Sequence, residues 1–221
     1  MMRGFIFDMD GVIIDSEPLH FQVEQDVCKK YGVELAEKEL ESYVGTRARD
    51  MWQQIKKTHG ATFEVSAVLN EANERKQAYV VSGKVEPISG IKELLAALKN
   101  NGYRIGLASS SPRPFIEAVL NSFGISDYFD VVMSGEEVAN GKPAPDVYRE
   151  TAEKLGVQPD ACTVLEDAAH GVQAALAAGM RVIGFVNPNS GSQDLSAAHD
   201  QVNDIGQIQP QAAEIVIEKN Q

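Results

Sequence analysis

The sequence predicts an α/β protein in which a parallel sheet is covered by helices and carries an inserted helical subdomain. Short apolar runs alternate with amphipathic helical patterns along most of the chain, whereas one long stretch near the N-terminus has helical periodicity alone. The composition is that of a globular protein, because 43% of the 221 residues are hydrophobic and 24% are charged. This length allows one large domain, or a core with a modest insertion.

Five apolar runs are the predicted strands. Each is short, as expected for a strand that helices bury on both faces of a parallel sheet. The first four end at a polar residue, which places polar side chains at one edge of the sheet. The runs cover residues 4–8, 104–109, 130–134, 163–166 and 181–186.

Four amphipathic helices are predicted between or beside these runs. Their apolar residues recur at helical spacing, and a glycine follows each segment. A glycine at this position fits a left-handed C-cap, where a side chain would clash. The helical faces span residues 91–98, 115–123, 147–155 and 172–176, and the glycines are Gly102, Gly124, Gly156 and Gly179.

Residues 16–84, called the helical insertion below, interrupt the alternation. Apolar side chains recur there every four residues, as a helix requires, for example at Leu19, Val23 and Val27. No buried strand is evident in this segment. Loops between strands and helices usually have about 2 to 6 residues, so a segment of this length after the first strand suggests a lid over the strand ends. We therefore expect residues 1–15 and 85–221 to form the catalytic core.

Charge and local composition exclude several function classes. The net charge of -12 disfavours a broad contact with nucleic acid or an anionic membrane. No run of about 18 apolar residues and no signal-peptide pattern occurs, so we expect a cytoplasmic protein. Cys28 and Cys162 are not in metal-ligand spacing and are interpreted as small buried hydrophobic residues.

The first strand ends with two acids, Asp8 and Asp10, followed by Gly11. In an open parallel sheet, ligands bind outside the carboxyl ends of the strands. Side chains alternate between the two faces of an extended strand, so both carboxylates lie on one side of the chain, about 7 Å apart. Two acids with a shared target can divide the work, with one attacking and the other carrying protons.

Polar residues at the other strand ends complete a candidate site. Ser109 and Ser110 end the second strand before a helix and can donate to phosphate oxygens. Lys142 lies in a proline-stiffened loop and suits the charge of a transferring phosphoryl group. Glu166 and Asp167 add hard oxygen ligands beside Asp8, a set suited to Mg²⁺.

At these residues the chain resembles the haloacid dehalogenase-like hydrolase superfamily. The matching motifs are the Asp-Met-Asp-Gly-Val segment that starts at Asp8, the serine at Ser109, the lysine of Gly-Lys-Pro at Lys142 and the acidic pair that starts at Glu166, in the family's order. The resemblance implies a Rossmann-like core with a small helical cap, formed by residues 16–84. It also implies Mg²⁺ and an aspartyl-phosphate intermediate.

The same resemblance assigns roles to individual residues. Asp8 would be the nucleophile, and Asp10 would act first as acid and then as base for water. Ser109 and Lys142 would complete the catalytic set. The metal ligands would be the Asp8 carboxylate, the Asp10 backbone carbonyl and Asp167, with Glu166 as a ligand or as a support of the ligands.

The substrate class follows from a finer likeness. Residues 15–20 and 107–111 resemble the branch that contains sugar-phosphate phosphatases and β-phosphoglucomutase. We expect a small phosphorylated metabolite, in particular a sugar phosphate, and a monomeric enzyme, with a weak dimer as the alternative. The predicted substrate contacts are Gly11, His20, Gly45, Arg47 and Ser110.

Two alternatives remain open at this point. The mutase typically has a Lys-Gly pair in its specificity loop, whereas Val44 precedes Gly45 here and the arginines are displaced. Hydrolysis is therefore preferred over mutase-type phosphotransfer, and free phosphate release would separate the two. The second alternative is a binding or regulatory protein that keeps the fold without turnover.

Overall fold

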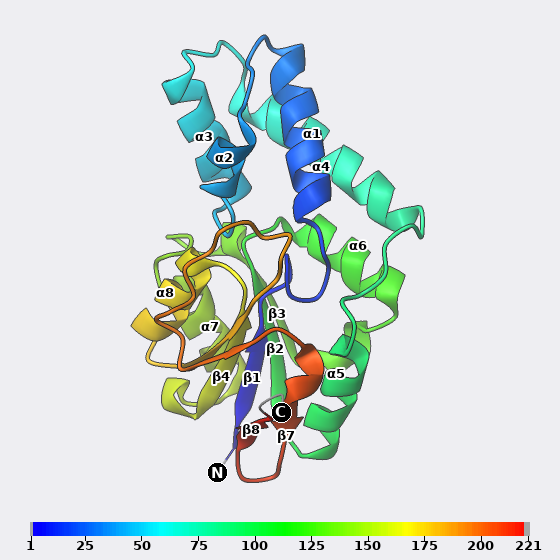
Figure 1. The fold of residues 1–221 in the computed structure, drawn as a ribbon, viewed down its shortest axis with the longest axis vertical. Helices are drawn as coiled ribbons and strands as arrows, with labels where there is room; N and C mark the ends of the chain where they lie inside the picture. Colours follow the sequence, from blue (N-terminus) through cyan, green and yellow to red (C-terminus); the bar gives the residue numbers. More distant parts are fainter. Residues whose placement is uncertain (1, 219–221) are drawn as a thin grey trace.

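A six-stranded parallel sheet forms the centre of the molecule, in a computed structural model that describes residues 2–218 (Figure 1). The strand order is β3-β2-β1-β4-β5-β6, so β1 lies inside the sheet with Phe7 between Leu107 of β2 and Leu165 of β4. The strands are β1 (Gly4–Phe7), β2 (Arg104–Ser109), β3 (Val131–Ser134), β4 (Cys162–Glu166), β5 (Arg181–Phe185) and β6 (Asp200–Val202).

Helices cover both faces of this sheet, as predicted. Helices α5 (Ile91–Asn100) and α6 (Arg113–Phe123) pack on one face, and α7 (Asp146–Leu155) and α8 (Ala169–Ala177) pack on the other. The apolar stripes of these helices form two buried clusters, one on each side of the sheet. A short antiparallel hairpin, β7 (Ile208–Pro210) and β8 (Ile215–Ile217), lies beside α5.

The helical insertion contains four helices and a hydrophobic cluster of its own, which includes the fully buried Trp52. In Figure 1 these helices stand together beyond the carboxyl ends of the strands. The C-terminal part of α4 reaches the core, where Ser122 of α6 donates a hydrogen bond to the carbonyl of Val80. The helices are α1 (Glu17–Lys30), α2 (Glu37–Glu41), α3 (Ala48–Thr58) and α4 (Val65–Val81).

The predicted α/β class with an inserted helical segment is thus confirmed. Two details were not predicted, namely strand β6 and the terminal hairpin, because each of their strands has only 3 residues, too few for a periodic pattern. Within residues 2–218, no helix combines the length and hydrophobicity that crossing a bilayer requires.

Candidate active site

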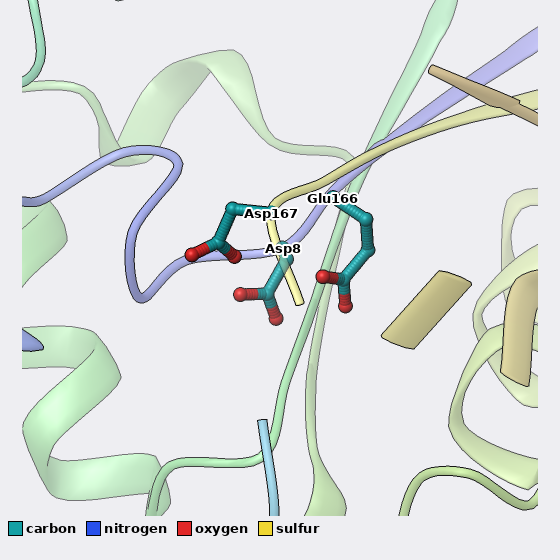
Figure 2. Close-up of side chains that lie close together, drawn as sticks. All are labelled: Asp8, Glu166 and Asp167. Carbon is teal, nitrogen blue, oxygen red and sulfur yellow. The ribbon is translucent and has the colours of Figure 1, made fainter. Parts of the chain in front are cut away.

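Three buried carboxylates meet at the carboxyl ends of β1 and β4. Asp8 follows β1, Glu166 ends β4, and Asp167 comes next, so the parallel pairing of the two strands places the acids side by side (Figure 2). Each contributes an oxygen, and these oxygens lie within 4.8 Å of one another. The structure therefore brings Asp8 together with an adjacent acidic pair that lies more than 150 residues later in the sequence.

Lys142 connects two of these acids. Its Nζ lies 2.6 Å from Asp8 Oδ1 and 2.6 Å from Glu166 Oε1, and its side chain is 1% exposed. Burial favours the neutral amine, but the Asp8 and Glu166 carboxylates outweigh it and raise the pKa of Lys142. The lysine is therefore a fixed ammonium between two carboxylates.

The formal charge of this cluster is unbalanced. With all three carboxylates ionised beside the one ammonium, the buried site would carry a formal charge of -2. Burial raises the pKa of Asp8 to about 8, the charges of Glu166 and Asp10 act in the same direction, and Lys142 opposes them. A divalent cation would remove the imbalance, and carboxylate oxygens are ligands that Mg²⁺ accepts.

The remaining hydrogen bonds distinguish the acids as metal ligands. Both oxygens of Glu166 are engaged, because Oε1 also accepts from the hydroxyl of Tyr148 at 2.8 Å and Oε2 accepts from the Ala168 amide at 3.0 Å. Among the described residues, Asp8 Oδ2 and Asp167 Oδ1 accept no hydrogen bond. Asp8 and Asp167 thus fit direct ligation, whereas Glu166 fits the support of Lys142.

Asp10 has different partners from Asp8. Its Oδ1 accepts from Ser16 Oγ at 2.7 Å, and its Oδ2 accepts from Ser111 Oγ at 2.7 Å and from Ser109 Oγ at 3.2 Å. The ring nitrogen Nε2 of His20 lies 3.3 Å from Asp10 Oδ1. Burial, together with Lys76, lowers the pKa of His20 to about 4, so its ring is neutral at pH 7. Serine hydroxyls therefore hold the Asp10 carboxylate, and the neutral ring of His20 lies beside it.

Gly11 allows the chain to turn directly after Asp8 and Asp10 and to approach Asp167 closely. It has φ +74, and a Cβ at this position would overlap the Asp167 carboxylate and approach Ser190. Its carbonyl accepts a hydrogen bond from Asn187 Nδ2 at 2.9 Å. Gly11 therefore permits the close approach of Asp167, and the loop after β5 holds it there.

The loop after β5 was missed by the sequence reasoning. Ser190 donates a short hydrogen bond to Asp167 Oδ2, and Asn187 reaches Gly11. Ser111, Ser16 and Tyr148 were likewise missed as partners of the acids. The position of residues 187–190 at the end of the fifth predicted strand was the available signal, since this edge of the sheet holds the ligand in such folds.

A cavity of about 50 Å³ lies between the strand ends and the helical insertion. Of the predicted substrate contacts, His20, Gly45 and Ser110 line it, and Asp8, Asp10 and Asp167 form its floor. Ser110 Oγ donates to the Gly45 carbonyl at 2.8 Å, so this serine joins the core to the insertion.

Arg47 is turned to the core loop beyond β3. Its Nη1 lies 3.3 to 3.4 Å from the carbonyl oxygens of Gly135, Val138 and Ala139, and its Nε donates to Asp50 Oδ2 at 2.6 Å. Arg47 and Gly11 are not among the residues that line the cavity in the described part of the chain. Arg47 instead fastens the insertion to the loop that carries Lys142.

Comparison with known proteins identifies the class. The chain belongs to the haloacid dehalogenase-like hydrolase family, whose sequence pattern matches residues 5–185. Hexitol phosphatase B from Escherichia coli (strain K12) is 39% identical over 185 residues, which cover 80% of this chain and 81% of that protein. A phosphorylated carbohydrates phosphatase from Thermotoga maritima is 32% identical over 198 residues, or 89% of this chain and 91% of the relative.

Solved structures agree with this membership. The β-phosphoglucomutase of Clostridium difficile superposes with a TM-score of 0.83 at 29% identity, covering 94% of this chain and 93% of that one. The predicted resemblance is therefore confirmed. The predicted enzyme class, a phosphoric monoester hydrolase of the haloacid dehalogenase-like type, is confirmed by the family match and by relatives named as phosphatases.

Proposed function

We propose that this chain is a Mg²⁺-dependent phosphatase that hydrolyses a small phosphomonoester, in particular a sugar or polyol phosphate, through a phosphorylated Asp8. The observation that carries this proposal is the buried cluster of Asp8, Glu166 and Asp167 around Lys142, in which three acids face a single ammonium. The names of the relatives support the substrate class. A hexitol phosphate and a phosphorylated carbohydrate are both phosphomonoesters of polyhydroxylated carbon chains.

In the first step, an Asp8 carboxylate oxygen forms a bond to phosphorus while the ester P–O bond breaks. The electron pair leaves with the alcohol oxygen, which takes a proton from Asp10. Lys142 holds Asp8 in place and offsets negative charge on the phosphoryl group. The product alcohol then leaves a phosphoryl group on Asp8.

In the second step, Asp10 takes a proton from water, and the water oxygen attacks phosphorus. The acyl-phosphate P–O bond breaks, its electron pair returns to Asp8, and phosphate is released. Mg²⁺ would be held by Asp8, Asp167 and the Asp10 carbonyl, and when bound it supplies charge neutralisation between the carboxylate and the anionic ester. Ser109 and Ser111 orient Asp10 for both proton transfers.

We further propose that residues 16–84 are a cap that moves relative to a core of residues 1–15 and 85–221. Residues of the insertion and of the strand ends line the same cavity, so a movement of the insertion would open or close the access of substrate to Asp8. A cytoplasmic location and a monomeric state stay predictions.

The rival function is phosphotransfer within a sugar phosphate, as in the mutase whose structure superposes on this chain. Val44 before Gly45 favours hydrolysis, because the lysine of the mutase pattern is absent. The test is to incubate the protein with Mg²⁺ and glucose 1-phosphate, and to measure free phosphate and glucose 6-phosphate separately. Phosphate release supports the proposal, whereas conversion to the 6-phosphate without release would assign the mutase function.

A further inference from the structure

The wall of the cavity that the helical insertion provides is acidic. Glu17 and Glu24 of α1 line it, and both residues are only 5% exposed. Lys76 of α4 lies opposite, with its Nζ 2.8 Å from Glu24 Oε1. Since both members of this ion pair are almost completely buried, Glu24 neutralises the lysine. Glu17 adds a second carboxyl group, whose pKa is raised by burial and by Asp10 and Glu24 nearby, so this wall offers an anion no unpaired cation.

Other cations near this wall are engaged elsewhere or face away. Arg47 is held by three backbone carbonyls and Asp50, outside the cavity lining. Lys142 is fixed between Asp8 and Glu166 at the floor. Within the described part of the chain, Lys76 is the one cation that the insertion contributes to the lining.

From this arrangement we infer that the Glu24–Lys76 pair, together with Glu17, selects monophosphates with an uncharged hydroxylated tail and excludes substrates that carry a second phosphate. This inference rests on the proposed phosphatase function. A second phosphate pointing at the insertion would meet two buried carboxyl groups and a lysine that is already neutralised. Hydroxyl groups, by contrast, can donate to Glu17 and Glu24 and accept from Lys76 and Asn73, which also lines this wall.

The test compares fructose 1-phosphate with fructose 1,6-bisphosphate, because they differ only in the second phosphate. We expect the wild-type kcat/KM to be higher for the monophosphate by about tenfold or more, since a phosphate buried without a free cation to compensate its charge is strongly unfavourable. Glu24→Gln keeps an oxygen that accepts from Lys76 but removes the neutralising charge. It should reduce the preference by about tenfold, mainly through a lower KM for the bisphosphate.

Glu71→Gln is the matched control, because Glu71 also pairs with a lysine between α1 and α4 but lies near the surface. It should leave the preference unchanged. A wild-type preference near one, or a preference that Glu24→Gln does not alter, would overturn the inference. If Glu24→Gln fails to fold, Glu17→Gln tests the same wall, and the wild-type comparison needs no variant.

p-Nitrophenyl phosphate separates this inference from the function on which it rests. Its aryl group carries no second phosphate, so its hydrolysis reports the floor of the site alone. If this ester is hydrolysed with Mg²⁺ and kcat/KM is equal for the two fructose esters, only the selection by the insertion is overturned. Absence of turnover with all three esters overturns the phosphatase function and, with it, the selection.

Discussion

Replacing Lys142 by methionine tests whether this lysine holds the acidic cluster together. The substitution replaces the alkyl stem of the lysine by an unbranched side chain of similar length but removes the ammonium that contacts Asp8 and Glu166 at 2.6 Å. Breaking a buried ion pair by removing one partner costs about 3–5 kcal/mol, because the other charge stays buried without compensation. For a chain of this size, about 1 kcal/mol lowers the Tm by about 2–4 °C, so a loss of roughly 6–20 °C is expected without metal.

The assay is thermal and urea unfolding of both proteins in excess chelator, repeated with Mg²⁺. Without metal, Lys142→Met should have the full loss of stability. With Mg²⁺ the loss should become smaller, because the cation compensates the charge that the lysine leaves behind. Phosphate release by the variant should fall by about 10²–10³-fold, the usual effect of removing one electrostatic contact to a reacting group.

Lys99→Met is the control. Lys99 pairs with Asp130 at 3.2 Å on the surface, where such a pair contributes about 0–1 kcal/mol. If Lys142→Met unfolds in chelator at the same urea concentration as wild type, the two short contacts do not stabilise the cluster and the reasoning from charge balance is refuted. If the variant is less stable but as active as wild type, Lys142 stabilises the cluster but takes no part in catalysis.

Three more predictions concern the floor of the site. Asp8→Asn should reduce phosphate release by at least about 10⁴-fold, as expected for loss of a nucleophile, while the protein still unfolds cooperatively; normal turnover would exclude Asp8 as the attacking group. Ser190→Ala removes the hydrogen bond to Asp167 and should weaken Mg²⁺ binding by about 10–100-fold in calorimetry, and an unchanged affinity would show that this bond does not orient the ligand. Gly11→Ala forces a side chain into the Asp167 carboxylate at a positive φ, so Mg²⁺-dependent stabilisation should disappear, whereas a Mg²⁺-dependent rise in Tm equal to that of wild type would contradict the predicted overlap.

The parts of the fold that could be predicted are those with a strong local signal. Strands β1 to β5 are continuous apolar runs, and their helices have one apolar face each, so the pattern alone located them. Strand β6 contains Asp200 and Gln201 at the edge of the sheet, where pairing with β5 and not hydrophobicity makes it a strand. A signal that depends on a partner strand is absent from local sequence.

The same distinction applies to the site. Asp8, Lys142 and Asp167 could be grouped because each follows a predicted strand and all such ends share one edge of the sheet. The orientation of Arg47 could not be predicted, since it depends on three carbonyls more than 85 residues away. The contact between Ser190 and Asp167 also depends on the path of a loop that lacks regular structure.

The proposed division of work between Asp8 and Asp10 has a physical basis in their different surroundings. Burial raises the pKa of Asp8 and the ammonium of Lys142 opposes this, so a bound cation would further favour the carboxylate that attacks. Asp10 is held by serine hydroxyls and lies beside a neutral imidazole. Hydroxyl groups can donate to a carboxylate or accept from a carboxylic acid, so they stabilise Asp10 in both forms. A group that must release a proton and then recover it needs such partners, whereas a nucleophile that must stay ionised needs fixed positive charge.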